Sequence, residues 1–134
     1  MAKKTLVTEV KSLVQTYHAQ NRLFSLVMMI PTEPTALNSA YTILVSAPWL
    51  DEQPRHEATD MILYDLIEQL GSTSSPLYSK IARISIRRTD DRFIEEITSV
   101  LDVDDELMIH NYTINGVHVE RAIILESQEL RVYA

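Results

Sequence analysis

Apolar residues recur at helical spacing in two parts of the chain. Between Thr5 and Gln20 they lie three or four positions apart, at Leu6, Val10, Leu13, Val14 and Tyr17. This spacing predicts an amphipathic helix with Thr5 as its N-cap. A second helix is predicted over Gln53–Leu70, with Pro54 in its first turn and Gly71 at its end.

Three segments have the pattern of β-strands. Leu23–Ile30 (LFSLVMMI) is nearly all apolar, which indicates a strand covered on both faces. Tyr41–Ala47 (YTILVSA) follows a polar connector, and we expect these two strands to form an antiparallel hairpin with a long loop. In Ile81–Arg88 polar and apolar residues alternate, so one face of that strand is expected to carry Arg83, Ser85 and Arg87, and the other Ala82, Ile84 and Ile86.

The last part of the chain predicts a short helix followed by a tight hairpin. Either Thr89 or Asp90 is expected to cap the helix, whose apolar set is Phe93, Ile94, Ile97, Val100 and Leu101. The dipeptide Asn115-Gly116 lies between the strand segments Leu107–Ile114 and Val117–Leu125. Asn-Gly favours a two-residue type I′ turn, which also fixes the register of the two strands.

These elements define the fold class that we expect. They occur in the order α-β-β-α-β-α-β-β, which predicts one α+β domain over residues 1–134 with a single mixed sheet of about five strands and three helices. The two strand–helix–strand units imply right-handed crossovers and some parallel pairing if their strands share one sheet.

Charge and composition narrow the classes of function. The 134 residues carry a formal net charge of −7 and include no cysteine, so disulfides and Cys-based zinc sites are excluded. A negative field repels phosphate backbones, so we expect no nucleic-acid partner. The longest apolar run, Leu26–Ile30, is too short to span a bilayer, and the first residues do not read as a secretory signal. We therefore expect a cytoplasmic protein with no membrane partner.

No known cofactor or metal motif stands out. The pattern His56-Glu57-Ala58-Thr59-Asp60 resembles a zinc-protease signature, but aspartate replaces its second histidine. Acidic residues at this place also suit the start of a helix, so we predict neither a metal site nor a cofactor here. With two glycines in the whole chain, a glycine-rich phosphate loop is not expected. The single tryptophan, Trp49, is expected in the core or at its rim.

One candidate site is a cluster of arginines. It comprises Arg83, Arg87, Arg88 and Arg92, four of the twelve lysine and arginine residues of the chain. Guanidinium groups on a strand face, next to the N-terminus of a helix, favour binding of a phosphate, a carboxylate or an acidic partner surface. The alternative is internal ion pairing with Asp90, Asp91 and other carboxylates.

A second candidate is the polar face of the predicted hairpin. The type I′ register places Thr113 opposite His118 and Asn111 opposite Glu120. A histidine and a glutamate two residues apart on one strand can support acid–base chemistry. The alternative is a solvated face behind an apolar one, and we expect His110 to pack at the edge of the core on that apolar side.

Two hypotheses of function follow. The first is a non-catalytic protein-interaction module, adaptor or chaperone-like, that acts as a homo-oligomer, because three helices are few for a sheet with a doubly buried strand. The second is a domain that binds a small anionic ligand, or a small enzyme, using the Arg83/Arg87 strand or the His118/Glu120 face. A concave pocket where at least three of these polar groups converge would favour the second, and a flat apolar face the first.

Overall fold

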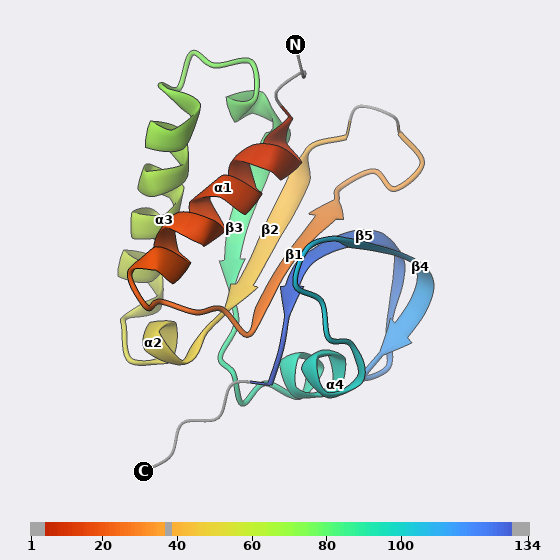
Figure 1. Cartoon of the computed structure of the whole chain (residues 1–134). Helices are drawn as coiled ribbons and strands as arrows, with labels where there is room; N and C mark the ends of the chain where they lie inside the picture. Colours follow the sequence, from red (N-terminus) through yellow and green to blue (C-terminus); the bar gives the residue numbers. More distant parts are fainter. Residues whose placement is uncertain (1–4, 37–38, 130–134) are drawn as a thin grey trace.

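The structure is a computed structural model that describes residues 5–36 and 39–129. Five strands form one mixed sheet in the order β3-β2-β1-β5-β4, as Figure 1 shows. The strands are β1 (Leu26–Pro31), β2 (Tyr41–Ser46), β3 (Ile81–Ile86), β4 (Leu107–Ile114) and β5 (Val117–Ser127), and the helices are α1 (Leu6–Ala19), α2 (Pro48–Asp51), α3 (Arg55–Leu70) and α4 (Arg92–Val100), with a 3-10 turn η1 at Tyr78–Lys80. The predicted α+β class and single mixed sheet are confirmed.

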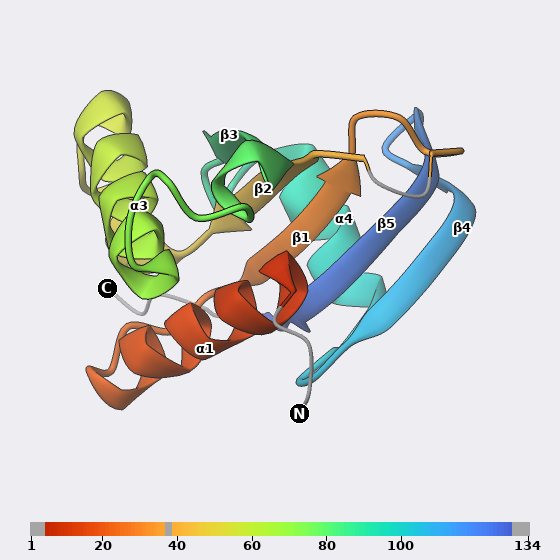
Figure 2. The same ribbon diagram turned by 90° about the horizontal axis from the view of Figure 1, so that it is seen from above.

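Helices cover both faces of the sheet, with α1 and α3 on one side and α4 on the other (Figure 2). Strand β1 lies in the middle, and its residues Leu26, Val27, Met28 and Met29 are each 0 % exposed. Val27 and Met29 pack with α1 and α3, whereas Leu26 and Met28 pack with α4. The prediction that this strand is buried on both faces is confirmed for Leu26–Met29, whose burial is complete within one chain. Leu23, expected at the start of the strand, precedes it and is 40 % exposed.

The first half of the chain folds largely as its pattern predicts. Strands β1 and β2 form the expected antiparallel hairpin, and β2 pairs in parallel with β3 after the crossover through α3. Thr5 caps α1, since its hydroxyl accepts from the Thr8 amide at 3.2 Å. Pro54 is the N-cap of α3 and not part of its first turn, and the short helix α2 was not predicted.

The second strand–helix–strand unit differs from the expectation. Strands β3 and β4 lie at opposite edges of the sheet, so this unit makes no parallel pair. The N-cap of α4 is Asp91 and not Thr89 or Asp90, because the Asp91 carboxylate accepts from the Phe93 amide at 2.9 Å. Val100, expected among the apolar residues of this helix, is 59 % exposed at its end.

The terminal hairpin curls toward α4 (Figure 1). Its turn has positive φ at Asn115 (48°) and Gly116 (75°), as a type I′ turn requires, and the Asn115 amide donates to the Glu96 carboxylate on α4. The predicted pair of Thr113 and His118 forms.

The hairpin differs from the prediction at two residues. The predicted register holds on both sides of Asn111, but Asn111 itself, with a φ of 50°, forms no ladder pair with Glu120. His110, expected to pack at the edge of the core, is exposed and lies opposite Arg121. The strict alternation of faces that the sequence implied is therefore broken in the middle of β4.

The sheet opens between β1 and β5 at one end. The two strands pair from Leu26 opposite Ser127 to Met29 opposite Ile123, and within the described chain no pair follows. Pro31, near the end of β1, has no amide hydrogen with which to extend the ladder. The first residues of β5 therefore pair with β4 alone. No helix in the described ranges is both long and apolar enough to cross a membrane.

Candidate functional site

A groove of about 610 Å³ lies where α4 leaves the sheet uncovered. Its floor is the α4-side face of the β1–β2–β3 half, one wall is the start of α4, and the other wall is the beginning of β5. The floor residues include Ile30, Thr42, Leu44, Arg83 and Ser85. A volume of this size is typical of pockets for small ligands.

The groove brings together residues from both sites that the sequence predicts. Arg83, Arg87 and Arg92 come from the arginine cluster, and His118 and Glu120 from the hairpin face. They meet because the hairpin curls back over the face of the sheet on which the alternation of β3 places Arg83. Residues separated by about thirty positions in the sequence thus line one concave surface.

Three of the predicted site residues lie outside this groove. Arg88 turns toward α2, where it donates to the Asp51 carbonyl oxygen at 3.2 Å and pairs with Asp90 at 3.1 Å. Thr113 is exposed on β4 and lies 3.5 Å from Nδ1 of His118. Asn111 is exposed at the interruption of the ladder.

The arginines of the groove divide into paired and unpaired groups. Arg87 forms an ion pair with Asp91 at 3.2 Å, so one of the alternatives raised by the sequence holds for this residue. The guanidinium groups of Arg83, Arg92 and Arg121 make no ion pair or hydrogen bond with any other residue in the described ranges. Unpaired guanidinium donors in a concave site are available to an anionic ligand.

Sequence reasoning missed Arg121 as a site residue. It follows Glu120 on β5 and lines the same groove, because the side-chain alternation breaks opposite Asn111. Arg121 lies opposite His110, and a strictly alternating strand would have turned it away from Glu120's face. The left-handed φ of Asn111 has no signature in the sequence beyond the tolerance of asparagine for that conformation.

The balance of charge in the groove is opposite to that of the whole chain. Four arginines line it against two carboxylates, those of Asp91 and Glu120, whereas the chain carries a formal charge of −7. The N-terminus of the nine-residue helix α4 adds the positive end of its dipole at the same wall. The groove is therefore a local cationic site in an acidic protein.

Apolar side chains contribute the rest of the surface. Leu44, Phe93 and Val119 are largely buried at the bottom, and Val117 is 51 % exposed at the rim. A purely ionic site would not need this surface. The combination favours a ligand with both an acid group and an apolar part.

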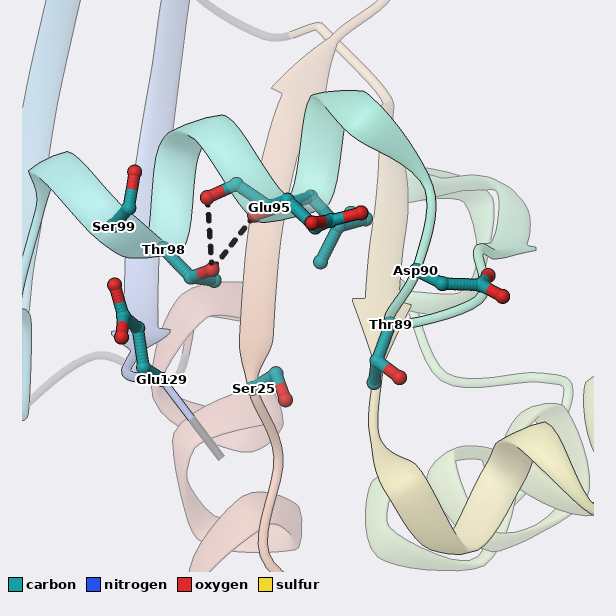
Figure 3. Close-up of a pocket in the computed structure, with 8 residues that line it drawn as sticks. Ser25, Thr89, Asp90, Glu95, Thr98, Ser99 and Glu129 are labelled. Atoms are coloured by element: carbon teal, nitrogen blue, oxygen red, sulfur yellow. Dashed lines mark hydrogen bonds between the residues drawn. The ribbon is translucent and has the colours of Figure 1, made fainter. Parts of the chain in front are cut away.

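A second pocket of about 420 Å³ lies under α4, as Figure 3 shows. Glu95, Thr98 and Ser99 project from the helix, with Ser25 and Glu129 below it. The Thr98 hydroxyl donates to the Ile94 carbonyl oxygen at 2.8 Å, and Ser99 donates in the same way to Glu96. The buried Ser25 hydroxyl has no hydrogen-bond partner in the described structure, but the Thr98 and Ser99 hydroxyls are engaged. The carboxylates of this pocket also share the sign of the whole chain, so it offers an anion less than the groove does.

The remaining sequence candidates have structural roles. His56, Glu57 and Asp60 lie in the first turns of α3, and no group of three metal-ligating residues is found in the described ranges. Trp49 packs against the core as expected, with its ring centroid 5.4 Å from that of Tyr17, and its indole nitrogen donates to the Leu23 carbonyl oxygen at 2.9 Å.

Comparison with family models, with curated proteins and with solved structures found no match for this chain. By its fold and its groove, the chain is an α+β domain with a cationic, partly apolar groove beside the open end of its sheet.

Proposed function

We propose that this chain is a binding module whose groove takes a ligand with an acid group and an apolar part. The observation that carries the proposal is the convergence of Arg83, Arg92 and Arg121, all without internal partners in the described structure, on one concave surface. Hydrogen bonds from guanidinium to carboxylate or phosphate are among the strongest in proteins, and they discriminate by charge.

Charge and shape together explain why the ligand is held at this place. The negative field of the whole chain disfavours anions elsewhere on the surface, whereas the groove concentrates positive charge beside Leu44 and Phe93. The ligand's acid group would meet the guanidinium groups, and its apolar part would cover the exposed portion of these side chains. Burial of that part adds affinity without a requirement for further polar contacts.

Binding, and not catalysis, is the function that the geometry favours. His118 and Glu120 both line the groove, but no hydrogen bond joins them, and the one partner of His118 in the described structure is Thr113 at 3.5 Å. An acid–base catalyst is normally oriented by a second group. The site supplies positive charge and shape but no such oriented pair.

Self-association remains a separate prediction. It rested on apolar sheet surface that three helices would leave open, yet Leu26–Met29 is fully buried within one chain. The part of the sheet that α4 does not cover is a groove lined by arginines and not a flat apolar face. A concave site of this kind is the observation that favours ligand binding over the adaptor hypothesis.

Titration calorimetry with phenyl phosphate tests the proposal, with benzyl alcohol as the uncharged analogue of similar size. We expect saturable binding of phenyl phosphate and none of benzyl alcohol. Arg83→Gln and Arg92→Gln should each weaken binding about tenfold, which corresponds to the loss of one charged hydrogen bond. Arg88→Gln is the matched control, because Arg88 is a neighbour that lies outside the groove. Equal binding by all three variants would refute the proposal.

A further inference from the structure

We infer that the ligand of the groove is an extended acidic segment of a partner polypeptide, which pairs as an added strand with the free edge of β5. This inference rests on the proposed function, because it names the kind of anion that the groove binds. It follows from two features of β5, its missing neighbour and the way in which it lines the groove.

The first feature is an unpaired edge. Strand β5 has β1 on one side only from Ile123 onward, whereas it pairs with β4 down to Val117. No backbone hydrogen bond outside the β4 ladder involves residues 117–121 in the described structure. The amide and carbonyl groups on the β1 side of this stretch are therefore available to another strand.

The second feature is that five consecutive residues, Val117 to Arg121, line the groove. Side chains of a strand alternate between its two faces, so a cavity that touches a single face meets every second residue. Thr42 and Leu44 of β2, and Arg83 and Ser85 of β3, follow that rule. The break in the alternation accounts for Arg121, but Val117 to Glu120 also line the groove without a gap, which indicates that the groove borders the edge of this strand, where its backbone is exposed.

The geometry of the groove fits an extended chain. Five strand residues provide an edge of roughly 16 Å, enough for about five residues of a partner. Along such a segment every second side chain would point toward Arg83 on the floor and Arg92 on the α4 wall, and acidic residues at those positions would meet them. Arg121 lies at the wall from which the added strand would receive its hydrogen bonds.

Charge complementarity selects an acidic segment among possible peptides. The unpaired arginines would repel a basic segment, and the exposed Val117 offers an apolar contact at the rim. Natural proteins protect open sheet edges with charge, and here the positive charge beside the edge permits only partners of the opposite sign. A small anion would use the arginines but would leave the edge of β5 unpaired.

The test uses the full chain and the peptide acetyl-Val-Glu-Val-Glu-Val-Thr-amide. Its affinity is compared with that of a peptide in which both glutamates are lysine, and with two analogues that are N-methylated at alternate amides, one for each register. We expect the acidic peptide to bind, the lysine peptide not to bind, and one of the N-methylated analogues to bind at least tenfold more weakly. Amide hydrogen exchange at residues 118–121 should slow when the acidic peptide is bound.

The arginine variants separate charge from strand pairing. Arg83→Gln and Arg92→Gln should each reduce peptide affinity five- to tenfold, and Arg88→Gln should leave it unchanged. If phenyl phosphate binds but the acidic peptide does not, or if both N-methylated analogues bind as well as the parent, strand addition is refuted while anion binding stands. If neither probe binds to the folded chain, both proposals fail.

Discussion

The guanidinium of Arg87 lies 3.2 Å from the carboxylate of Asp91, and this ion pair joins the segment after β3 to the start of α4. The same carboxylate caps the helix by accepting from the Phe93 amide at 2.9 Å. One side chain therefore fixes the wall of the groove and also neutralises one of its four arginines. Its two roles can be separated by substitution.

Replacing Asp91 with asparagine should keep the cap and remove the charge. Asparagine caps helices about as well as aspartate, so Asp91→Asn should change the free energy of unfolding by less than about 0.5 kcal/mol. Asp91→Ala loses the cap as well and should destabilise the fold by about 1 kcal/mol. Since Arg87 is then unpaired, Asp91→Asn should raise the affinity for phenyl phosphate about threefold. Urea unfolding and calorimetry measure the two effects, and a weaker affinity in Asp91→Asn would contradict this role.

Tyr17 and Asp65 connect α1 to α3. The Tyr17 hydroxyl, on a side chain that is 3 % exposed, donates to the Asp65 carboxylate. Burial, and then the hydrogen bond to this carboxylate, raise the pKa of Tyr17 above the ordinary value. Tyr17→Phe leaves the carboxylate without its donor and should destabilise the fold by about 2 kcal/mol in urea unfolding at pH 7.

A second tyrosine of α3 provides the matched control. Tyr64 is 62 % exposed, and a hydrogen bond to the exposed Glu68 raises its pKa. Because water can replace that bond, Tyr64→Phe should change the free energy of unfolding by less than about 0.5 kcal/mol. Equal losses in the two variants would show that Tyr17 and Asp65 do not hold the helices together.

Local patterns predicted most of the fold because they depend on short stretches of chain. The helical spacing from Leu6 to Tyr17 and the Asn115-Gly116 turn each specify one element, and both are confirmed. The position of β5 between β1 and β4 was not predicted, because strand order depends on contacts between distant segments. The N-cap of α4 was assigned to the wrong residue, because Thr89, Asp90 and Asp91 can all cap a helix. Only the three-dimensional contacts distinguish them.

The sequence predicted most of the polar groups of the groove, but as two separate sites. Arg83 and Arg87 followed from strand alternation, and His118 and Glu120 from the hairpin register. Their convergence depends on the curl of the hairpin, which no local pattern specifies. Arg121 was missed because it faces the groove only where the alternation breaks.

The tight turn between β4 and β5 depends on its glycine. Gly116 has a φ of 75°, and a Cβ atom at this position would meet nothing within 4 Å, so backbone strain alone opposes a larger residue. Gly116→Ala should therefore destabilise the fold by about 1 kcal/mol. Asn115→Gly is the control, because glycine adopts the φ of 48° at that position without strain, and its effect should stay below about 0.5 kcal/mol. A thermal melt of both variants measures the difference, and identical stability would refute the argument.

Glu126 makes stability depend on pH. Its side chain on β5 is 8 % exposed, and burial, followed by the charges of Asp104 and Asp102, raises its pKa to about 7. The carboxyl therefore binds a proton in the folded chain between about pH 4.5 and pH 7, where the unfolded chain has released it. Because the folded state binds more protons in this range, stability falls as the pH rises through it.

Glu126→Gln removes this ionisation. It should keep the hydrogen bond from the side-chain Nε2 of Gln128, which lies 3.0 Å from the Glu126 carboxyl oxygen. The free energy of unfolding of the wild type should fall, relative to that of the variant, by on the order of 2 kcal/mol between pH 5 and pH 8. His18 and Glu126 line one surface pocket, and burial lowers the pKa of His18, which therefore acts in the opposite direction. Because His18 is present in both proteins, its effect cancels in the comparison. The pocket also holds Lys11, which pairs with Asp105 at 2.6 Å, and this pair is likewise unchanged. Parallel pH profiles for the wild type and Glu126→Gln would show that Glu126 ionises as freely in the folded chain as in the unfolded one.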